Sequence, residues 1–301
     1  MSTTSLHWRG NIAIIAGNYI SADFPNKRLV LTGTRTAHSA PTVLSTRNGW
    51  YLCDLSKPHL PTLISMIEDN TFTYNSSDIL GDLVAVCVGV PGVQLYSMAN
   101  PLSPALLSTI NTSGFAQGVL LKNNRAYISD GSSGMQIYDI TNPFSPTFVG
   151  VFNTPGNVKG INVVGNTAYI ADNTSLQIVD ISNPASPSFL GSYTGSAFDV
   201  KTAGNFAYIA SSSSGIIILN VSNPSLPTLV TTVPAPIGSS SNPKALSIAL
   251  LGTKAYLSMF EWAGILDITS PSAPFWVDSV FGVSSNNKIL VDNHSFLFQL
   301  I

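Results

Sequence analysis

The segment LQIVDISNPASP, residues 176–187, decides the fold, because its second half recurs along the chain. Segments of this kind start at residues 54, 97, 139, 180, 220 and 267, so successive starts lie 43, 42, 41, 40 and 47 residues apart. In chain order they read DLSKPHLP, SMANPLSP, DITNPFSP, DISNPASP, NVSNPSLP and DITSPSAP. A period of about 42 residues is typical of a repeat architecture.

The recurring segment has the chemistry of a turn between two strands. Its first side chain, an Asp, Ser or Asn, can accept hydrogen bonds from backbone N–H groups two or three residues further on. Each proline fixes φ and lacks the N–H that a sheet needs, so the preceding strand must end there. We therefore interpret the Asp residues of these segments as turn formers and not as catalytic acids.

A second signal lies about 21 or 22 residues before each closing proline. It reads NNRAYISD (123–130), GNTAYIAD (165–172), GNFAYIAS (204–211) and GTKAYLSM (252–259). Gly-Asn and Asn-Asn pairs favour tight hairpins, and the apolar stretches on either side have the length and β-branched content of buried strands. Each repeat therefore predicts four strands. In one copy we expect them at 160–164, 167–171, 175–180 and 187–193.

Four short strands per repeat, arranged around a ring, are the pattern of a β-propeller blade. Dividing 301 residues by about 42 predicts an all-β, seven-bladed β-propeller of four-stranded antiparallel blades, with six blades as the alternative. We expect one domain over residues 1–301. Its ring is expected to close in a blade shared by about residues 1–25 and 285–301, which would leave no open sheet edge. In that blade NIAIIAG (11–17) and the following NYISADF (18–24) would supply the outer strands, and DNHSFLFQ (292–299) would supply inner ones.

The repeat pattern, GN-x-AYIAD followed by LQIVDISNP-x-x-P, resembles the LVIVD repeat family of bacterial and archaeal β-propellers. Residues 176–187 are the best copy, and the resemblance covers about residues 61–280. It implies the propeller fold and little about activity, because that family has no common assigned chemistry and propellers host many functions. The first repeat departs from the pattern, with SAPTVLS (39–45) where N-x-AYI-x-D is expected.

Composition and charge limit the classes of partner. The formal net charge is −2, so the sequence shows no basic footprint for nucleic acid. No apolar run approaches the roughly 18 residues of a membrane span. The start of the chain lacks a signal-peptide pattern, which leaves a cytoplasmic location and export by a non-classical route both open. Cys53 and Cys87 lie in apolar, strand-like runs and are expected to be buried free thiols.

The sequence lacks the usual signatures of catalytic and metal sites. Its four histidines lie far apart, no nucleophile elbow occurs, and no Gly-rich phosphate loop precedes a helix. We therefore expect no metal ion, no cofactor and no catalytic residue. Side chains from different blades could still converge on the central channel, and the candidates are Asp78, Lys159, Asp199 and Asn286. The alternative is that these four are polar channel-lining residues with bound water.

The two faces of the predicted ring differ in how much they vary between repeats. The turn after the first strand of a blade and the closing turn share one face and are nearly invariant within the chain. The tip between the second and third strands and the linker to the next blade share the other face, which we call the variable face. Variation between copies marks positions that the scaffold does not determine, so function can lie there.

The last complete repeat is unusual twice on the variable face. Its tip, SMFEWAG (258–264), carries Phe260, Glu261 and Trp262, and the linker before it, residues 233–245, is the longest among the regular repeats. Aromatic residues are enriched in binding hot spots, so we predict a contact site centred on these three residues. The alternative is that the linker folds over both aromatic side chains as plain packing. Further candidates on this face are Phe115, Asn157, Lys159 and Phe198 in the linkers and Arg47 at the tip of the basic first blade.

The sequence thus predicts a non-enzymatic binding or scaffold module that presents its variable face to a protein partner or a glycan. One alternative is a hydrolase-like or lactonase-like enzyme with its site at the mouth of the central channel. Another is a structural component of a surface or particle assembly, which the low content of charged residues, 9%, also suits. A metal or a deep polar channel pocket would favour the enzyme, whereas an apolar patch at 259–264 with a stable oligomer would favour assembly.

Overall fold

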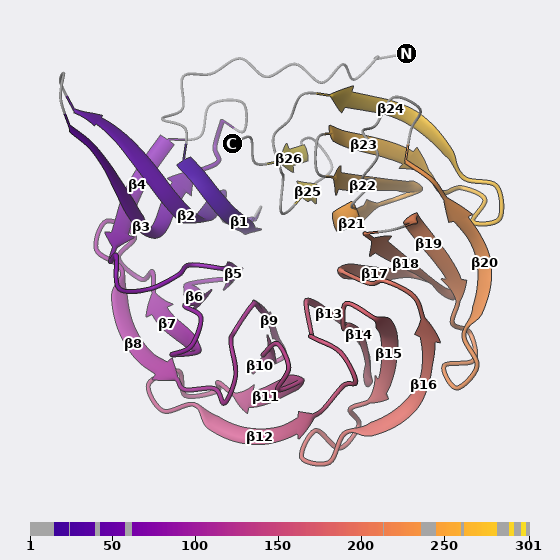
Figure 1. Cartoon of the computed structure of the whole chain (residues 1–301). Coiled ribbons are helices and arrows are strands. Elements are labelled where there is room, and N and C mark those ends of the chain that lie inside the picture. The colour runs from indigo at the N-terminus through magenta and orange to yellow at the C-terminus, as the bar shows by residue number, and fades with distance from the viewer. Residues whose placement is uncertain are drawn as a thin grey trace.

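The computed structural model describes residues 15–23, 25–39, 43–57, 62–212, 214–235, 245–259, 262–281, 289–291 and 296–298. These residues form strands β1 to β26 with connecting turns and loops, and none of them is helical. Six four-stranded antiparallel sheets stand around a central axis as the blades of a propeller (Figure 1). A two-stranded sheet, β25–β26, accompanies them.

Each blade is a meander whose strands follow one another outward from the axis in chain order. The first three blades consist of β1 (Ile15–Asp23), β2 (Arg28–Ser39), β3 (Val43–Asp54) and β4 (Thr62–Glu68); β5 (Ser76–Leu80), β6 (Leu83–Cys87), β7 (Val93–Ser97) and β8 (Ala105–Ile110); and β9 (Gly118–Lys122), β10 (Arg125–Ser129), β11 (Met135–Asp139) and β12 (Thr147–Phe152).

The remaining strands are given in the same order. They are β13 (Gly160–Val164), β14 (Thr167–Ala171), β15 (Ser175–Asp180) and β16 (Ser188–Thr194); β17 (Asp199–Ala203), β18 (Phe206–Ser211), β19 (Gly215–Asn220) and β20 (Thr228–Val233); β21 (Ala245–Leu251), β22 (Lys254–Met259), β23 (Trp262–Asp267) and β24 (Phe275–Phe281); and the pair β25 (Ile289–Val291) and β26 (Phe296–Phe298).

The predicted repeat of four strands is confirmed. In the fourth blade the first three strands have the predicted bounds, and the outermost strand, β16, begins one residue later than expected. The Gly-Asn pair makes the tight turn between β13 and β14, and Gly165 there has a φ of 56°. That left-handed conformation suits glycine because it lacks a Cβ atom.

The prediction of seven four-stranded blades is wrong, and the described residues form six, as the alternative predicted. The N-terminal stretch explains the difference, because β1 pairs with β2 as the innermost strand of the first blade instead of serving as an outer strand of a closing blade. β25 and β26 form the expected hairpin and, among the described residues, pair only with each other. β25 contacts β1, β21 and β22, so this hairpin lies between the last and first blades (Figure 1). The rest of the predicted closing blade lies outside the described residues.

The first blade departs from the repeat because its central hairpin is extended. β2 and β3 have 12 residues each and pair continuously from Arg28 opposite Asp54 to Ser39 opposite Val43. The counterpart of the AYIA stretch is therefore residues 29–32, next to the turn between β1 and β2. The position predicted for this counterpart, residues 39–45 (SAPTVLS), is wrong. The hairpin extends beyond the ring in Figure 1.

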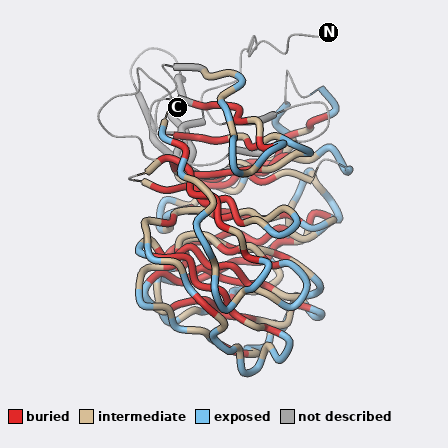
Figure 2. Tube along the Cα trace, turned by 90° about the vertical axis from the view of Figure 1, so that its right-hand side faces the viewer, coloured by how far each residue is buried: buried red, intermediate tan, exposed pale blue. Residues whose placement is uncertain are grey.

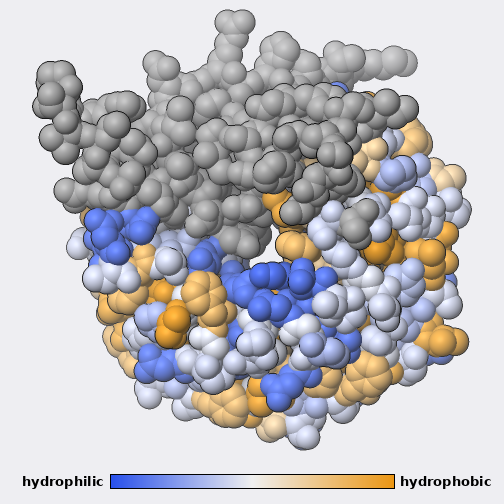
Figure 3. Space-filling model, viewed as in Figure 1, coloured by the Kyte–Doolittle hydropathy of each residue, from blue (hydrophilic) through white to orange (hydrophobic). Residues whose placement is uncertain are grey.

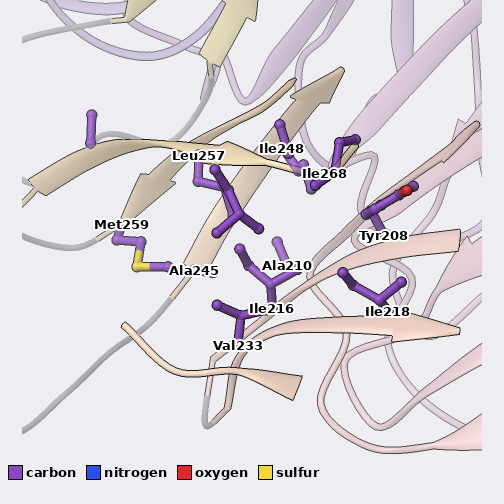
Figure 4. Packing of buried hydrophobic residues seen from close by; sticks show 13 residues of the cluster. Tyr208, Ala210, Ile216, Ile218, Val233, Ala245, Ile248, Leu257, Met259 and Ile268 are labelled. Atoms are coloured by element: carbon purple, nitrogen blue, oxygen red, sulfur yellow. The ribbon is translucent and has the colours of Figure 1, made fainter. Parts of the chain in front are cut away.

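The hydrophobic core lies between neighbouring blades, because each sheet has two apolar faces. Five clusters of buried side chains each draw on two consecutive blades. In the cluster between the fifth and sixth blades, Ile216 and Ile218 of β19 pack with Leu257 and Met259 of β22 (Figure 4). Seen from the side, the buried residues run through the middle of the blades and the exposed residues gather in the turns and outer strands (Figure 2).

Side chains of the innermost strands connect consecutive blades from the first to the sixth. The connections run from Ser21 to Ser77, 2.8 Å; from the Leu121 N–H to Asp78, 2.7 Å; from Lys122 to the Val163 carbonyl, 2.6 Å; from Asn162 to Thr202, 2.9 Å; and from the Ile248 N–H to Asp199, 3.2 Å. These bonds join β1, β5, β9, β13, β17 and β21 in sequence. The two channel candidates Asp78 and Asp199 therefore hold the ring together.

The six closing turns have the predicted hydrogen bond. In each of them the side chain at the head of the segment accepts the backbone N–H two residues later, at 2.8–3.2 Å between nitrogen and oxygen. The turn also contacts the preceding blade. A Cβ atom added to Gly150 of β12 would lie 2.2 Å from the Pro184 carbonyl oxygen in the next closing turn, so only glycine fits there. At the equivalent place in β8, Ser108 donates a hydrogen bond to the Pro143 carbonyl, 2.6 Å.

Both cysteines are buried free thiols, as predicted. Burial raises the pKa of Cys53 to about 11, so its thiol stays protonated at neutral pH. Across the part of the chain that the structure describes, no helix has the length and hydropathy to cross a membrane.

Replacing Asp78 with alanine should destabilise the ring. The Leu121 N–H would lose its carboxylate acceptor, and an unpaired buried donor costs about 1–3 kcal/mol of unfolding free energy. Urea denaturation measures that loss. The matched control is Asp82→Ala, which breaks the exposed Arg28–Asp82 ion pair and should cost at most about 1 kcal/mol. Equal losses in the two variants would contradict the role assigned to Asp78.

Replacing Asp267 with asparagine should flatten the acid end of the stability profile. The Lys254 ammonium, 2.8 Å away, and the Thr269 hydroxyl and N–H lower the pKa of Asp267 from 3.8 to about 2. A carboxyl whose pKa is lowered by folding contributes stability that is complete above the unfolded-state pKa and is lost as the pH falls through the folded-state pKa. The wild type should therefore lose more melting temperature than Asp267→Asn between pH 4 and pH 2. Asparagine keeps the turn, as Asn220 does in the fifth blade.

Candidate functional site

The meander topology places the predicted turns as expected, so the variable face exists as a structural feature. Tips between second and third strands and linkers between blades meet there, and backbone bonds join them. The Ala116 N–H donates to the Gly89 carbonyl at 3.1 Å, and the Val158 N–H donates to the Gly131 carbonyl at 2.9 Å. Each of these bonds connects the tip of one blade to the linker that leads into the next blade's innermost strand.

The predicted aromatic centre of this face lies mostly outside the described residues. Phe260, Glu261 and linker residues 236–244 are not among those described, and Trp262 opens β23, where its backbone lies opposite Phe281. Arg47 is not at a tip. It lies within β3, opposite Arg35 of β2, because the pairing of β2 with β3 continues as far as Ser39 opposite Val43. The candidates Phe115, Asn157, Lys159 and Phe198 are described, and all four lie in linkers.

Four residues occupy the same position, immediately before or near the start of an innermost strand. In each of them the backbone N–H donates to a carbonyl at the end of the blade's second strand, at 2.8–3.0 Å between nitrogen and oxygen. The residues are Asn75, Gln117, Lys159 and Phe198, and the acceptors are Cys87, Ser129, Ala171 and Ala210. These residues therefore surround the mouth of the channel on the variable face. Figure 3 shows hydrophilic surface gathered beside the central opening, over the region where β5, β9 and β13 converge in Figure 1.

Lys159, Gln117 and Asn157 form one hydrogen-bonded cluster at this mouth, which we call the mouth cluster. The Lys159 ammonium donates to Gln117 Oε1 at 2.6 Å, and Gln117 Nε2 donates to Asn157 Oδ1 at 2.6 Å. The cluster joins the linkers of the third and fourth blades. Lys159 is half-buried, and this desolvation lowers its pKa below the ordinary value of 10.5.

Gln117 was not among the sequence candidates, although a signal for it exists. It occupies the repeat position of Lys159 and Phe198, so aligning the linkers would have grouped the three. Phe115, two residues earlier, is 41% exposed, and its ring lies against the preceding blade's tip. A Cβ atom added to Gly89 of that tip would lie 3.1 Å from the ring.

Two buried carboxylates hold the linkers in place. Asp130, at the end of β10, accepts the Thr112 hydroxyl, the Gly114 N–H and the Gln136 amide at 2.6–2.7 Å. Burial raises the pKa of Asp130 above the ordinary value, although the bonds from Thr112 and Gly114 act in the opposite direction. Asp172, at the same position in the fourth blade, accepts the Gly156 N–H at 3.2 Å and four donors from Thr174 and Ser175 at 2.6–3.0 Å.

Other blades fill this anchoring position differently. In the second blade it is Val88, which packs in a cluster with Phe72 of its linker. In the fifth blade it is Ser211, whose hydroxyl is buried and has no partner among the described residues. The next residue, Ser212, takes over the connection through a 2.6 Å bond to Ser196 of the linker. The residue at this position therefore has a structural role, and it is polar in some blades and apolar in another.

The structure assigns structural roles to the described channel candidates except Lys159. Asp78 and Asp199 accept backbone N–H groups of neighbouring blades, as described above. Asn286 lies outside the described residues. Within the described ranges no group of three or more His, Cys, Asp or Glu side chains is placed to hold a metal ion.

The third, fourth and fifth blades, with their linkers, match a known repeat family. The family model of the LVIVD repeat fits residues 113–154, 155–194 and 194–234. The chain is therefore a β-propeller in which residues 113–234 are LVIVD repeats. A comparison with curated proteins finds no match.

Solved structures share the fold at low sequence identity. A protein from Lactobacillus plantarum is 11% identical over 94% of this chain and 87% of that one, with a TM-score of 0.72. The β-propeller domain of Cps50 (Swd1) from Myceliophteria thermophila is 11% identical over 92% and 90%, with a TM-score of 0.71. Sqt1 of Chaetomium thermophilum, solved with the N-terminus of ribosomal protein L10, is 13% identical over 93% and 79%, with a TM-score of 0.64.

Replacing Asp130 with alanine should loosen the linker that carries Phe115. The Gly114 N–H and the Thr112 hydroxyl would lose their acceptor, so amide exchange across residues 111–117 should rise by about tenfold or more. Hydrogen exchange read by mass spectrometry tests this. The Asp139→Ala control removes a closing-turn acceptor on the other face and should leave exchange at 111–117 unchanged. Equal exchange in both variants would show that Asp130 does not hold the linker.

Proposed function

We propose that the chain acts as a non-enzymatic binding module, one propeller domain over residues 1–301 that presents its variable face to a protein partner, with a glycan as the second choice of ligand. One observation carries the proposal. The head side chains of the closing turns on the invariant face accept backbone N–H groups of the fold, whereas the variable face carries the partly exposed Phe115 ring and the polar mouth cluster.

The arrangement suits recognition because the ring presents its linkers on a fixed scaffold. Bonds from Asp130, Asp172 and the tip carbonyls hold these linkers before any ligand binds, so little entropy is lost when one does. A half-exposed aromatic ring beside polar groups is a common composition for a binding hot spot. Sqt1, a protein with a similar fold, was solved bound to a segment of another protein, which illustrates this use of the fold.

The aromatic sector at Phe260, Glu261 and Trp262 belongs to the same proposal. The repeat pattern predicts that this sector shares the variable face with Phe115, Asn157, Lys159 and Phe198, one blade beyond Phe198. Arg47 lies in the extended hairpin of the first blade and is proposed as a contact for a partner that reaches that side of the ring.

A paired capture experiment tests the proposal. Wild-type protein, Phe115→Ala and Phe260→Ala/Trp262→Ala are immobilised and exposed to lysate and surface extract of the source organism, and the retained proteins and glycans are identified. The wild type should retain a partner with a Kd that rises by about tenfold or more in at least one variant, as hot-spot truncation predicts.

The matched control is Phe144→Ala. Phe144 is 69% exposed and lies in a closing turn on the opposite face, so this variant should bind the partner as well as the wild type. All four proteins must melt at the same temperature. Equal binding by all four, or loss only in Phe144→Ala, would refute the assignment of the variable face. Retention of further copies of this chain alone would support the alternative of an assembly component.

A further inference from the structure

Lys159 determines the direction of the hydrogen bonds in the mouth cluster. An ammonium group has three N–H donors and no acceptor, so the Gln117 atom 2.6 Å from it is the carbonyl oxygen. The other end of that amide, Nε2, is then a donor, and the Asn157 atom 2.6 Å from it is an oxygen. The orientation of both amides is therefore fixed by the lysine, because a flip of either one would bring two donors together.

Within the cluster each amide oxygen accepts a hydrogen bond, whereas several N–H donors remain unused. Two N–H groups of Lys159 and the Nδ2 group of Asn157 have no acceptor among the described residues. Lys159 also has no carboxylate within ion-pair distance in the described part of the chain. The cluster therefore carries a positive charge and several unused donors.

The neighbouring backbone approaches the two amides of the cluster closely. A Cβ atom added to Gly131 would lie 3.1 Å from Gln117 Nε2 and 3.7 Å from Asn157 Nδ2. Gly131 has a φ of 62°, so the tip requires glycine, and no side chain at this position covers the amide donors. Desolvation strengthens the field of a half-buried ammonium compared with one in water.

We propose that the mouth cluster is a binding site for an oxyanion, a carboxylate or phosphate group of the ligand, held by Lys159 and Asn157 and oriented by Gln117. This inference deepens the proposed function, because it assigns the chemistry of one contact on the variable face. An oxyanion supplies acceptors only and matches a set of donors with a net positive charge, and such charge-assisted bonds are the stronger ones.

Nuclear magnetic resonance of lysine Cε-labelled protein tests the site without any partner. Sodium acetate and sodium phosphate are titrated separately, with sodium chloride at matched ionic strength as the reference, and Lys159→Met assigns the resonance. The Lys159 signal should move saturably with acetate or phosphate and not with chloride. A response to acetate alone assigns a carboxylate, one to phosphate alone assigns a phosphate, and a response to both assigns a general oxyanion site.

Two variants separate a specific site from bulk screening. Asn157→Asp keeps an oxygen for the Gln117 amide and replaces the donor Nδ2 with a second oxygen, so the anion affinity measured at Lys159 should fall by about tenfold or more. Lys201→Met, which removes a lysine paired with Asp199, should leave the response of Lys159 unchanged.

Two results would overturn the proposal: a response no larger than that to chloride, or an unchanged affinity in Asn157→Asp. The outcome is independent of the capture experiment, because this titration uses purified protein and simple salts. A variable face that binds a partner without an anion response at Lys159 would keep the proposed function and remove this inference alone.

Discussion

Each blade of this propeller has two apolar faces, and its neighbours in the ring must cover both. An isolated four-stranded sheet of this kind would expose residues such as Ile216 and Leu257, which are fully buried between the fifth and sixth blades. Burial of a large aliphatic side chain contributes about 1.5–3 kcal/mol, so the faces dominate the stability of the ring. The other features of the molecule can be understood as ways to bring blades together at the correct spacing and to keep them there.

Specific contacts fix the spacing of the blades at three distances from the axis of the ring. Near the axis, side chains such as Asp78 and Asn162 join innermost strands of consecutive blades. At the rim, the closing turn approaches the preceding blade so closely that Gly150 cannot carry a Cβ atom. Between them, on the variable face, Asp130 holds a linker to the tip of its own blade. A buried carboxylate that accepts several N–H groups is therefore mostly an architectural device in this protein, and acidity alone is a poor guide to its function.

The mouth cluster differs from these devices in what it leaves unused. The carboxylates of Asp130, Asp172 and Asp199 accept hydrogen bonds from the scaffold. Lys159 and Asn157, in contrast, have unused donors at the mouth of the channel. Phe115 adds an exposed ring a short distance along the same linker. A positive charge, unused donors and a partly exposed aromatic ring on one face suit the recognition role proposed for it.

The sequence by itself determined the blade, because strand length, turn chemistry and proline positions are local properties that recur at a fixed period. The bounds of β13 to β15 and the hydrogen bond in every closing turn could be predicted for that reason, as could the buried state of Cys53 and Cys87. Only the tertiary structure decided the number of blades, since the pairing of β1 with β2 instead of a closing strand depends on contacts around the whole ring. It also decided the roles of Asp78, Asp199 and Gln117. Their partners lie about 40 to 50 residues away on the next blade, and a single sequence carries no record of which distant groups meet.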